Sequence, residues 1–510
     1  MDVGRVGVAL RKMLEWRQGP GSPLCRIRDD TGVGGGLERG MTQMLPSAFL
    51  AAVKDLLGPK GWSEAPETLL AASTPWRGTY QGNTPLIVRP ASTTEAAALV
   101  KLCGQYGVAM TPQGGNTGLI DGGTPHGEVC VSMTRMNALR ETDTFNNSLT
   151  IEAGATLVAA QQAAEAAGRL FPLSLGSEGT ATIGGLISTN AGGVAVLRYG
   201  MMRDLILGLE VVLPSGEVWD GLSGLRKNNT GYDLKHLFAG AEGTLGLITA
   251  ATLKLFPQVS SATAWVICAS ADDVVKLLSL VRGRVGDSVT SFEIIPANAV
   301  DMVVADIPTA RDPMPSNAPW RVLMEVSQTD GAYARTLLES ALAAAMEEGL
   351  VQDAAIATSE AQAKAFWHIR ETIPLSKRAY GAALNQDISV PVSRIPVFIE
   401  ACNAAVRTVL PTADFVIFGH VGDGNLHYSV VEAQGAAAPQ LKDHEGAITR
   451  VIYDTVMAHG GSISAEHGVG RLKRDELARL RPPAATQAMR AIKRALDPQG
   501  IMNPGRVVSV

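Results

Sequence analysis

Several features that define common classes of protein are missing from this sequence. Only five of its 510 residues are cysteines, and no two form a CxxC pair. This argues against a disulfide framework or an iron–sulfur cluster and favours a reducing compartment.

The formal net charge is −5, and no basic stripe is interleaved with aromatic residues, so we do not expect nucleic-acid binding. Polar residues or glycine interrupt the longest apolar runs well before the length that spans a bilayer. We expect a cytoplasmic protein without a transmembrane segment, whose membrane contact, if any, is peripheral.

The motifs of three large enzyme classes are also missing. The sequence has no GxGxxG after a strand, no Walker A lysine and no GxSxG elbow, so nicotinamide dehydrogenases, nucleotide hydrolases and serine hydrolases lose their main support. Residues 1–40 lack the apolar segment of a signal peptide and show poor apolar periodicity. We expect them to form a disordered extension, with the folded chain beginning near Met41.

The length of the chain predicts two or three domains. In the first, placed at 41–258, strand and helix patterns alternate over 86–112 as in a βαβ unit, and a hairpin is predicted over 209–220. This region contains three glycine-rich loops. Each loop alone fits a tight turn equally well, but together they favour backbone amides wrapped around a ligand such as a pyrophosphate. They cover residues 112–123, 175–185 and 189–193.

Strand and helix patterns alternate again in a second α+β domain, placed at 259–470, and residues 471–510 form a helical C-terminal segment. The second domain contains the densest group of metal-ligating residue types in the chain, in GHVGDGNLHYS (419–429) and SAEHGVG (464–470). The DGN turn between His420 and His427 should place both imidazoles at the ends of adjacent antiparallel strands. Glu466 would complete a two-histidine, one-carboxylate metal site with open positions, and His467 would be free to act as a base. The alternative is a pair of surface turns whose histidines only form hydrogen bonds.

Arg370 stands in the aromatic segment FWHIRETIP. A helical arginine is usually a solvated charge. Beside Phe366 and Trp367, however, its guanidinium is also suited to clamping a carboxylate.

Six segments occur in the order found in a known family: PQGGNTG, LGSEGTATIGGLISTNAGG, LRKNNTGYDLKHLFAGAEGTLGLIT, GHVGDGNLH, SAEHGVGRLK and DPQGIMNPGR. The chain thereby resembles the FAD-linked D-2-hydroxyacid dehydrogenases, which share the fold of vanillyl-alcohol oxidase and p-cresol methylhydroxylase. This resemblance implies an α+β fold. It consists of a two-subdomain FAD-binding domain, an α+β cap (substrate) domain with an antiparallel sheet, and a C-terminal segment that returns to the FAD domain.

The resemblance also implies which residues contact FAD, which we expect to be bound without a covalent bond because the flavin loop reads GGNTG and has no histidine. The first loop would hold the pyrophosphate, the later segments would follow the flavin, and the C-terminal asparagine would return near the ring. These residues are Pro112, Gln113, Gly114, Gly115, Asn116, Thr117, Gly118, Ser177, Gly179, Thr180, Gly184, Gly185, Asn190, Gly192, Gly193, Glu242, Gly243, Ile248 and Asn503.

By the same resemblance, His420, His427 and Glu466 match the ligands of a divalent metal, zinc or manganese. His467 matches the general base and Arg370 the clamp for the substrate carboxylate. The expected reaction is oxidation of D-2-hydroxyglutarate to 2-oxoglutarate. The metal lowers the pKa of the 2-hydroxyl, His467 takes the proton, and hydride passes to flavin N5.

Two departures from the family pattern leave the substrate open. Asn385, which we group with the catalytic residues, stands where many hydroxyglutarate-type relatives carry a lysine, and Ser429 replaces an asparagine. Loss of the lysine removes a cation that a second carboxylate would use. The alternatives are a D-lactate or glycolate dehydrogenase, a flavin subunit of a larger oxidase complex, and a metal-dependent hydrolase without flavin. The partners expected are a small 2-hydroxy acid, an electron acceptor such as electron-transfer flavoprotein or a quinone, and a second copy of the chain.

Overall fold

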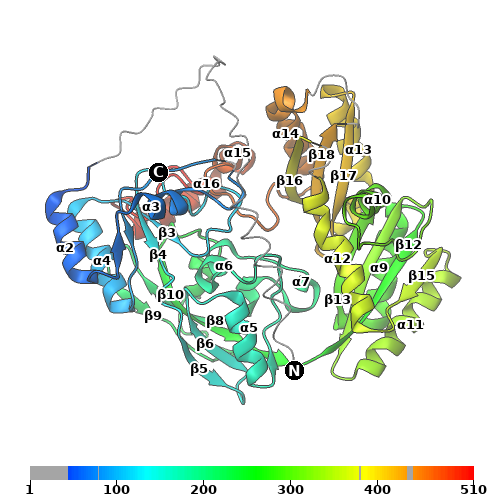
Figure 1. Cartoon of the computed structure of the whole chain (residues 1–510), viewed down its shortest axis with the longest axis horizontal. Helices are drawn as coiled ribbons and strands as arrows, with labels where there is room; N and C mark the ends of the chain where they lie inside the picture. Colours follow the sequence, from blue (N-terminus) through cyan, green and yellow to red (C-terminus); the bar gives the residue numbers. More distant parts are fainter. Residues whose placement is uncertain (1–43, 79, 378–380, 433–439) are drawn as a thin grey trace. The chain divides into compact units, whose positions relative to one another are not determined.

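The N-terminal part of the molecule is built on a four-stranded sheet in the order β1-β2-β4-β3 (Figure 1). The computed structural model describes residues 44–78, 80–377, 381–432 and 440–510, so the expected extension at 1–40 lies outside the described residues. β4 lies between β2 and β3, parallel to both, so the predicted βαβ unit brackets a strand from further along the chain. The elements are α2 (Ser47–Leu57), β1 (Trp62–Ser63), α3 (Pro66–Ser73), β2 (Ile87–Val88), α4 (Thr93–Tyr106), β3 (Met110–Gln113) and β4 (Val129–Ser132).

A five-stranded antiparallel sheet in the order β5-β6-β10-β8-β9 follows. The predicted hairpin over 209–220 corresponds to β8 and β9. The last long strand, Leu247–Lys254, ends before Phe256–Pro257, which pairs instead with Arg169–Leu170. The elements are β5 (Leu139–Asp143), β6 (Ser148–Glu152), α5 (Leu157–Ala166), β7 (Arg169–Leu170), α6 (Ile183–Thr189), α7 (Val196–Tyr199), η1 (Met202–Leu205), β8 (Ile206–Val212), β9 (Val218–Asp220), α8 (Lys235–Phe238), β10 (Leu247–Lys254) and β11 (Phe256–Pro257).

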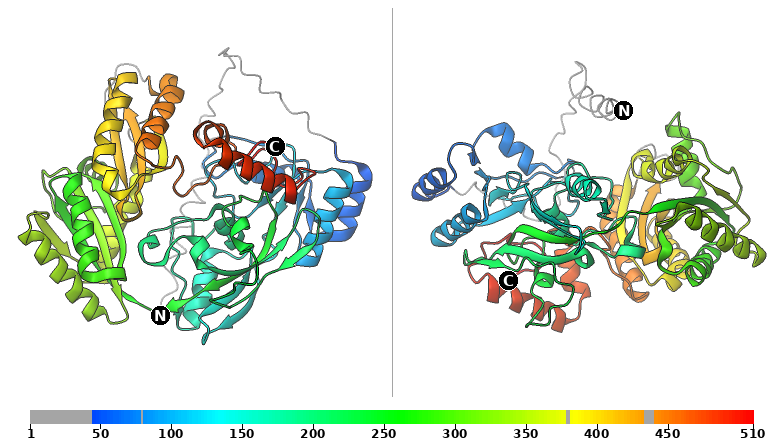
Figure 2. Two further views of the ribbon diagram at one scale, coloured as in Figure 1. Left: turned by 180° about the vertical axis from the view of Figure 1, so that it is seen from behind. Right: turned by 90° about the horizontal axis from the view of Figure 1, so that it is seen from below.

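The C-terminal segment returns to these first two sheets, as expected (Figure 2). It contains α15 (Arg474–Leu480) and α16 (Pro483–Leu496). Lys493 Nζ donates to Thr244 O at 2.7 Å, and Met502 forms a bridge with Met110 of β3. The chain therefore ends beside the glycine-rich loops.

Residues 260–432 build a seven-stranded antiparallel sheet in the order β15-β12-β14-β13-β17-β18-β16. The strands are β12 (Ser260–Cys268), β13 (Val289–Pro296), β14 (Trp320–Gln328), β15 (Asp353–Ile356), β16 (Ala383–Ser389), β17 (Ala413–His420) and β18 (Asn425–Glu432). Two halves of like topology meet where β13 pairs with β17, Glu293 opposite His420. The strand at this seam is β13 in the first half and β17 in the second, and each follows the first long helix of its half.

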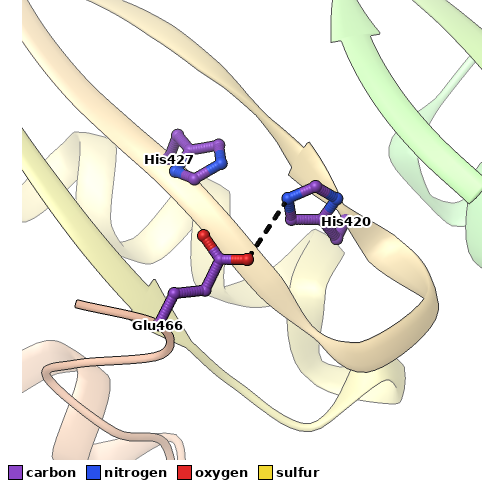
Figure 3. A group of neighbouring side chains, drawn as sticks. All are labelled: His420, His427 and Glu466. Carbon is purple, nitrogen blue, oxygen red and sulfur yellow. Dashed lines mark ion pairs between the residues drawn. The ribbon is translucent and has the colours of Figure 1, made fainter. Parts of the chain in front are cut away.

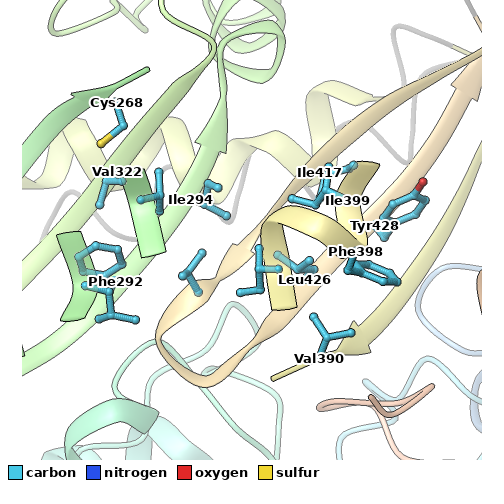
Figure 4. Packing of buried hydrophobic residues seen from close by; sticks show 14 of the residues in the cluster. Cys268, Phe292, Ile294, Val322, Val390, Phe398, Ile399, Ile417, Leu426 and Tyr428 are labelled. Atoms are coloured by element: carbon cyan, nitrogen blue, oxygen red, sulfur yellow. The ribbon is translucent and has the colours of Figure 1, made fainter. Parts of the chain in front are cut away.

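Helices cover both faces of this sheet because its side chains alternate between them. One face packs against α9 (Ala271–Val285), α11 (Gly331–Glu347), α13 (Ile395–Val409) and α14 (Leu441–Ala458), in a core that continues across the seam (Figure 4). The other packs against α10 (Ala297–Asp306) and α12 (Glu360–Ser376). Short helices η2 (Gly286–Ser288), η4 (Val392–Arg394) and η5 (Val421–Asp423) join the strands. Our sequence analysis did not include α10 and α14, and the domain boundaries at 258 and 470 stay predictions.

Candidate active site

The predicted site lies on the α12-facing side of the second half of the sheet. The strand register builds a polar grid on that side, because residues two apart in a strand point to the same face. Asn385 lies opposite Ser429, Asp387 opposite His427, and His427 opposite Phe418. At the seam, His420 lies opposite Glu293. Residues far apart in sequence are thus brought onto one surface.

His420, His427 and Glu466 come together on this grid (Figure 3). Each offers a ligand atom, and these atoms all lie within 4.8 Å of one another. His420 Nε2 is 3.6 Å from Glu466 Oε1, and the two imidazole rings are 5.4 Å apart. His420 ends β17 and is buried, whereas His427 lies within β18. The histidines therefore do not belong to surface turns.

Asp387 holds the loop that carries Glu466 and His467. Its Oδ2 accepts the backbone N–H of Glu466 at 2.9 Å and that of His467 at 3.0 Å, and its Oδ1 accepts Asn425 Nδ2 at 2.8 Å. His467 Nδ1 lies 3.5 Å from the same carboxylate. Burial opposes ionisation of Asp387, but His467, His427 and Lys473 outweigh it and keep its pKa low. Our sequence analysis gave Asp387 no role, although a carboxylate at the start of DISVP was a visible signal.

Glu293 is a second residue that sequence reasoning missed. It is fully buried, accepts Arg370 Nε at 2.6 Å on Oε2, and contacts His420 Nδ1 through Oε1. Burial alone would raise its pKa, but Arg370 and His420 hold that pKa at about 2. Burial would likewise lower the pKa of His420, and Glu293 raises it to about 9. An acid inside the apolar run SFEII was the available signal.

The group fits a divalent metal on its donor chemistry. Glu293 occupies Nδ1 of His420 and leaves Nε2 toward Glu466, which is the carboxylate support that metal-bound histidines usually have. The side chains of His427 and Glu466 make no hydrogen bond to any residue that the structure describes. Burial, Arg370 and His420 lower the pKa of His427, and burial raises that of Glu466 to about 7. A bound cation would compensate the buried carboxylate and displace the proton of His420.

Arg370 is buried in α12, and its guanidinium lies over the Phe418 ring at 4.7 Å. Glu293 takes only Nε. The two terminal nitrogens form no hydrogen bond within the described chain. The guanidinium is thus fixed in place with a pair of donors free for a carboxylate.

Lys377, just after α12, is a further residue that sequence reasoning missed. Its Nζ donates to Asn385 Oδ1 and to Ser429 Oγ, both at 2.6 Å, and lies 5.2 Å from the centre of the Phe418 ring. Burial, with Arg77 and Arg370, lowers its pKa to about 7. The two positions that depart from the family pattern therefore both contact one buried lysine.

The residues predicted to contact FAD converge around the glycine-rich loops. A Cβ on Gly115 would lie 1.9 Å from Thr180 O, so only glycine permits the first two loops to approach. Asn503 Nδ2 donates to Gly122 O at 2.9 Å and to Glu242 O at 2.7 Å. Two of the predicted residues end β3 (Pro112, Gln113), and five follow it (Gly114, Gly115, Asn116, Thr117, Gly118). Three precede α6 (Ser177, Gly179, Thr180), two lie in α6 (Gly184, Gly185), and three follow it (Asn190, Gly192, Gly193). Two precede β10 (Glu242, Gly243), one lies in β10 (Ile248), and one stands near the C-terminus (Asn503).

These loops leave space that a cofactor can fill. A Cβ on Gly118 or on Gly179 would meet no atom within 4 Å. Several of the predicted side chains are used inside the protein. Among them, the Gln113 amide donates to Ala72 O and Gly123 O at 2.8 Å each, and Ile248 packs in the core of the five-stranded sheet. Contact with a cofactor at these two positions would come from the backbone.

Direct contacts join the glycine-rich loops to the metal-ligand group. A Cβ on Gly192 would lie 3.2 Å from Glu466 Oε1. The Glu242 carboxylate accepts the N–H groups of Val469 at 2.7 Å and Gly470 at 2.8 Å. A cavity of about 360 Å³ is lined by Asn190, Glu242 and Glu466, among others. The predicted flavin segment and metal group thus form one site.

Comparison with known proteins identifies this arrangement. Residues 84–221 match the family described as FAD binding domain, and residues 258–507 match the C-terminal domain of FAD linked oxidases. D-2-hydroxyglutarate dehydrogenase of Arabidopsis thaliana is 37% identical over 466 residues, 91% of this chain and 82% of the relative. The protein of that name in Stutzerimonas stutzeri is 34% identical over 471 residues, 91% and 99% of the two chains. The chain belongs to the FAD-linked D-2-hydroxyacid dehydrogenases.

Solved structures confirm the fold of this dehydrogenase. p-Cresol methylhydroxylase with substrate bound superposes with a TM-score of 0.72 at 16% identity, covering 91% of this chain and 98% of that one. Alkyldihydroxyacetonephosphate synthase superposes with a TM-score of 0.67 at 17% identity, covering 90% and 84%. The FAD-binding domain favours redox chemistry over the metal-dependent hydrolase that the metal-ligand group alone left open.

The location of the dehydrogenase in the cell stays a prediction. Among the described helices, none is long and apolar enough to cross a membrane. The names of the plant relative and of a 36% identical relative from Bos taurus specify mitochondria, and that of the bacterial relative does not.

Proposed function

We propose that this dehydrogenase oxidises D-2-hydroxyglutarate to 2-oxoglutarate with FAD and a divalent metal, zinc or manganese. The observation that carries the proposal is the position of Glu466, whose carboxylate belongs to the metal-ligand group and lies beside Gly192 of the predicted flavin segment. The names of the relatives support the choice of substrate.

Each polar side chain of the site has a role in this proposal. Arg370 binds the 1-carboxylate through its two free nitrogens. His467 accepts the proton of the 2-hydroxyl, and burial lowers its pKa, so the imidazole is neutral near pH 7. The Asp387 carboxylate, 3.5 Å from Nδ1, stabilises the imidazolium that forms.

The two cofactors supply the remaining chemistry. The glycine-rich loops would hold FAD without a covalent bond, and the cofactor would supply the acceptor for the C2 hydride. A metal held by His420, His427 and Glu466 would make the 2-hydroxyl more acidic.

Anaerobic mixing of the FAD-loaded protein with D-2-hydroxyglutarate tests the proposal. We expect the flavin absorbance to bleach, and removal of metal with a chelator to slow bleaching by on the order of 1000-fold. Re-addition of zinc or manganese should restore the rate. A flavin that no 2-hydroxy acid reduces would refute the proposed reaction, and full activity of a metal-free protein would refute the role of the metal.

The electron acceptor is proposed to be an electron-transfer flavoprotein or a quinone, and the oligomer a homodimer. Turnover of the isolated chain with an artificial dye would show that no further subunit is needed for the oxidation of the acid. Sedimentation of the FAD-loaded protein measures the oligomeric state.

A further inference from the structure

Lys377 is a buried lysine whose described hydrogen-bond partners are uncharged. It is 6% exposed, and its ammonium is held by the amide oxygen of Asn385 and the hydroxyl of Ser429. Ser429 Oγ donates to the same amide oxygen at 2.9 Å. The described part of the chain offers Lys377 no carboxylate partner. These contacts fix the position of the ammonium without neutralising it.

The charge balance around Lys377 differs from that around Arg370. Arg370 forms an ion pair with Glu293, whereas no carboxylate among the described residues offsets the Lys377 ammonium, and burial, Arg77 and Arg370 all disfavour its protonated form. Burying an unpaired ammonium costs several kcal/mol. An anion bound beside Lys377 would remove this cost. The structure therefore favours a ligand that brings a negative charge to this point.

The sheet register gives the distance from this point to the metal-ligand group. Asn385 and Ser429 form the cross-strand pair next to Asp387 and His427 on the same face. Such rows are about 7 Å apart. That spacing is comparable with the span between the two carboxylates of a short diacid.

We infer that Lys377 binds the second carboxylate of a 2-hydroxydicarboxylate and selects such substrates over D-lactate and glycolate. The inference rests on the proposed function. It also gives Asn385 and Ser429 a positioning role: they hold a cation that reaches the site from the end of α12. The alternative is a lysine that only ties the end of α12 to β16 and β18.

The test compares Lys377→Met with the wild-type holoenzyme on D-2-hydroxyglutarate and D-lactate. We expect the ratio of the two kcat/KM values, dicarboxylate over monocarboxylate, to fall by on the order of 100-fold. Lys377→Arg should recover part of that ratio, because it restores the charge. Lys364→Met is the matched control, since Lys364 lies on α12, which Lys377 follows, is exposed and pairs with Glu360; its ratio should equal that of the wild type.

A measurement without turnover accompanies the kinetics. Calorimetric titration should show that Lys377→Met weakens binding of 2-oxoglutarate far more than binding of pyruvate. Equal loss for both substrates and both ligands would mean a structural lysine, and a wild-type preference for D-lactate would also overturn the inference. In both cases the proposed 2-hydroxyacid oxidation would stand. A wild-type flavin that no 2-hydroxy acid reduces would instead refute the proposed function.

Discussion

The two halves of the seven-stranded sheet share a strand order and differ in how their α12-facing polar groups are satisfied. In the first half, Arg321 donates to Ala318 O at 2.5 Å and Ser316 O at 2.7 Å. Glu325 accepts Thr263 Oγ1 and Trp367 Nε1, both at 2.8 Å. In the second half, the side chains of His427 and Glu466 have no such partners among the described residues. Arg321 Nε and the Trp265 indole also lack partners among these residues in the first half, so the two halves differ in that the second leaves a metal-ligand group available.

The two halves also differ in the strand pairing at their outer edges. In the first half β15 pairs with β12 along four residues. Among the residues that the structure describes, the corresponding edge of β16 has only the single bridge between Ser389 and Ser462. The chain beyond Ser462 leaves the ladder, and its backbone N–H groups at Glu466 and His467 bind the Asp387 side chain instead. A loop replaces a strand and brings two functional residues to the grid. His427 and Glu466, whose side chains lack hydrogen-bond partners among the described residues, stand in a cluster of titratable groups, and such a cluster marks a candidate functional site.

Replacing His427 should remove metal binding by the second half of the sheet, and with it most of the turnover. His427→Ala breaks no hydrogen bond within the described chain, so the protein should fold and keep FAD. We expect loss of bound metal and a fall in turnover on the order of 10000-fold, because one of three ligands is gone. Metal content by atomic emission and dye-linked turnover measure this. Retention of both would exclude His427 as a ligand.

His467→Ala should separate the base from the metal group. His467 lies outside the His420–His427–Glu466 group, although its ligand atom also lies within 4.8 Å of those of Asp387 and Glu466. Because the three proposed ligands are kept, we expect both cofactors to remain bound. Turnover should fall about 1000-fold through loss of the proton acceptor. Rapid-mixing measurement of flavin reduction isolates this step. A variant that loses metal and activity together would assign His467 to the metal group instead.

Glu293→Gln tests the seam between the halves. The substitution leaves Arg370 buried without its counter-charge, which should cost about 3 kcal/mol of unfolding free energy. Urea unfolding of the metal-free protein measures it. Glu339→Gln is the control, because its ion pair with Arg335 is exposed and should contribute less than about 1 kcal/mol. Equal stability of the two variants would show that the Glu293 network is not stabilising.

Local patterns in the sequence predicted part of this site. The DGN turn placed His420 and His427 on paired strands, and the glycine-rich loops indicated a ligand. Glu293 could not be assigned in this way, because its contact with His420 depends on pairing between the two halves at a sequence separation of 127. Lys377 follows a helix and reaches Asn385 and Ser429 only through the packing of α12 on the sheet. The roles proposed for these residues stay predictions.

Glu325→Gln, a substitution in the first half of the sheet, should have the smallest effect on activity and stability. Metal, FAD and turnover should not change, because Glu325 belongs to a satisfied network away from the metal-ligand group.

Burial raises the pKa of Glu325 above that of the unfolded chain, since its partners are neutral donors. The wild type therefore loses the contribution of this carboxyl as the pH rises through the folded-state pKa, and the variant does not. We expect the variant to gain stability relative to the wild type between pH 5 and pH 8, by less than about 1 kcal/mol. Urea unfolding at both pH values measures the difference, and a loss of turnover would show that the first half also serves the reaction.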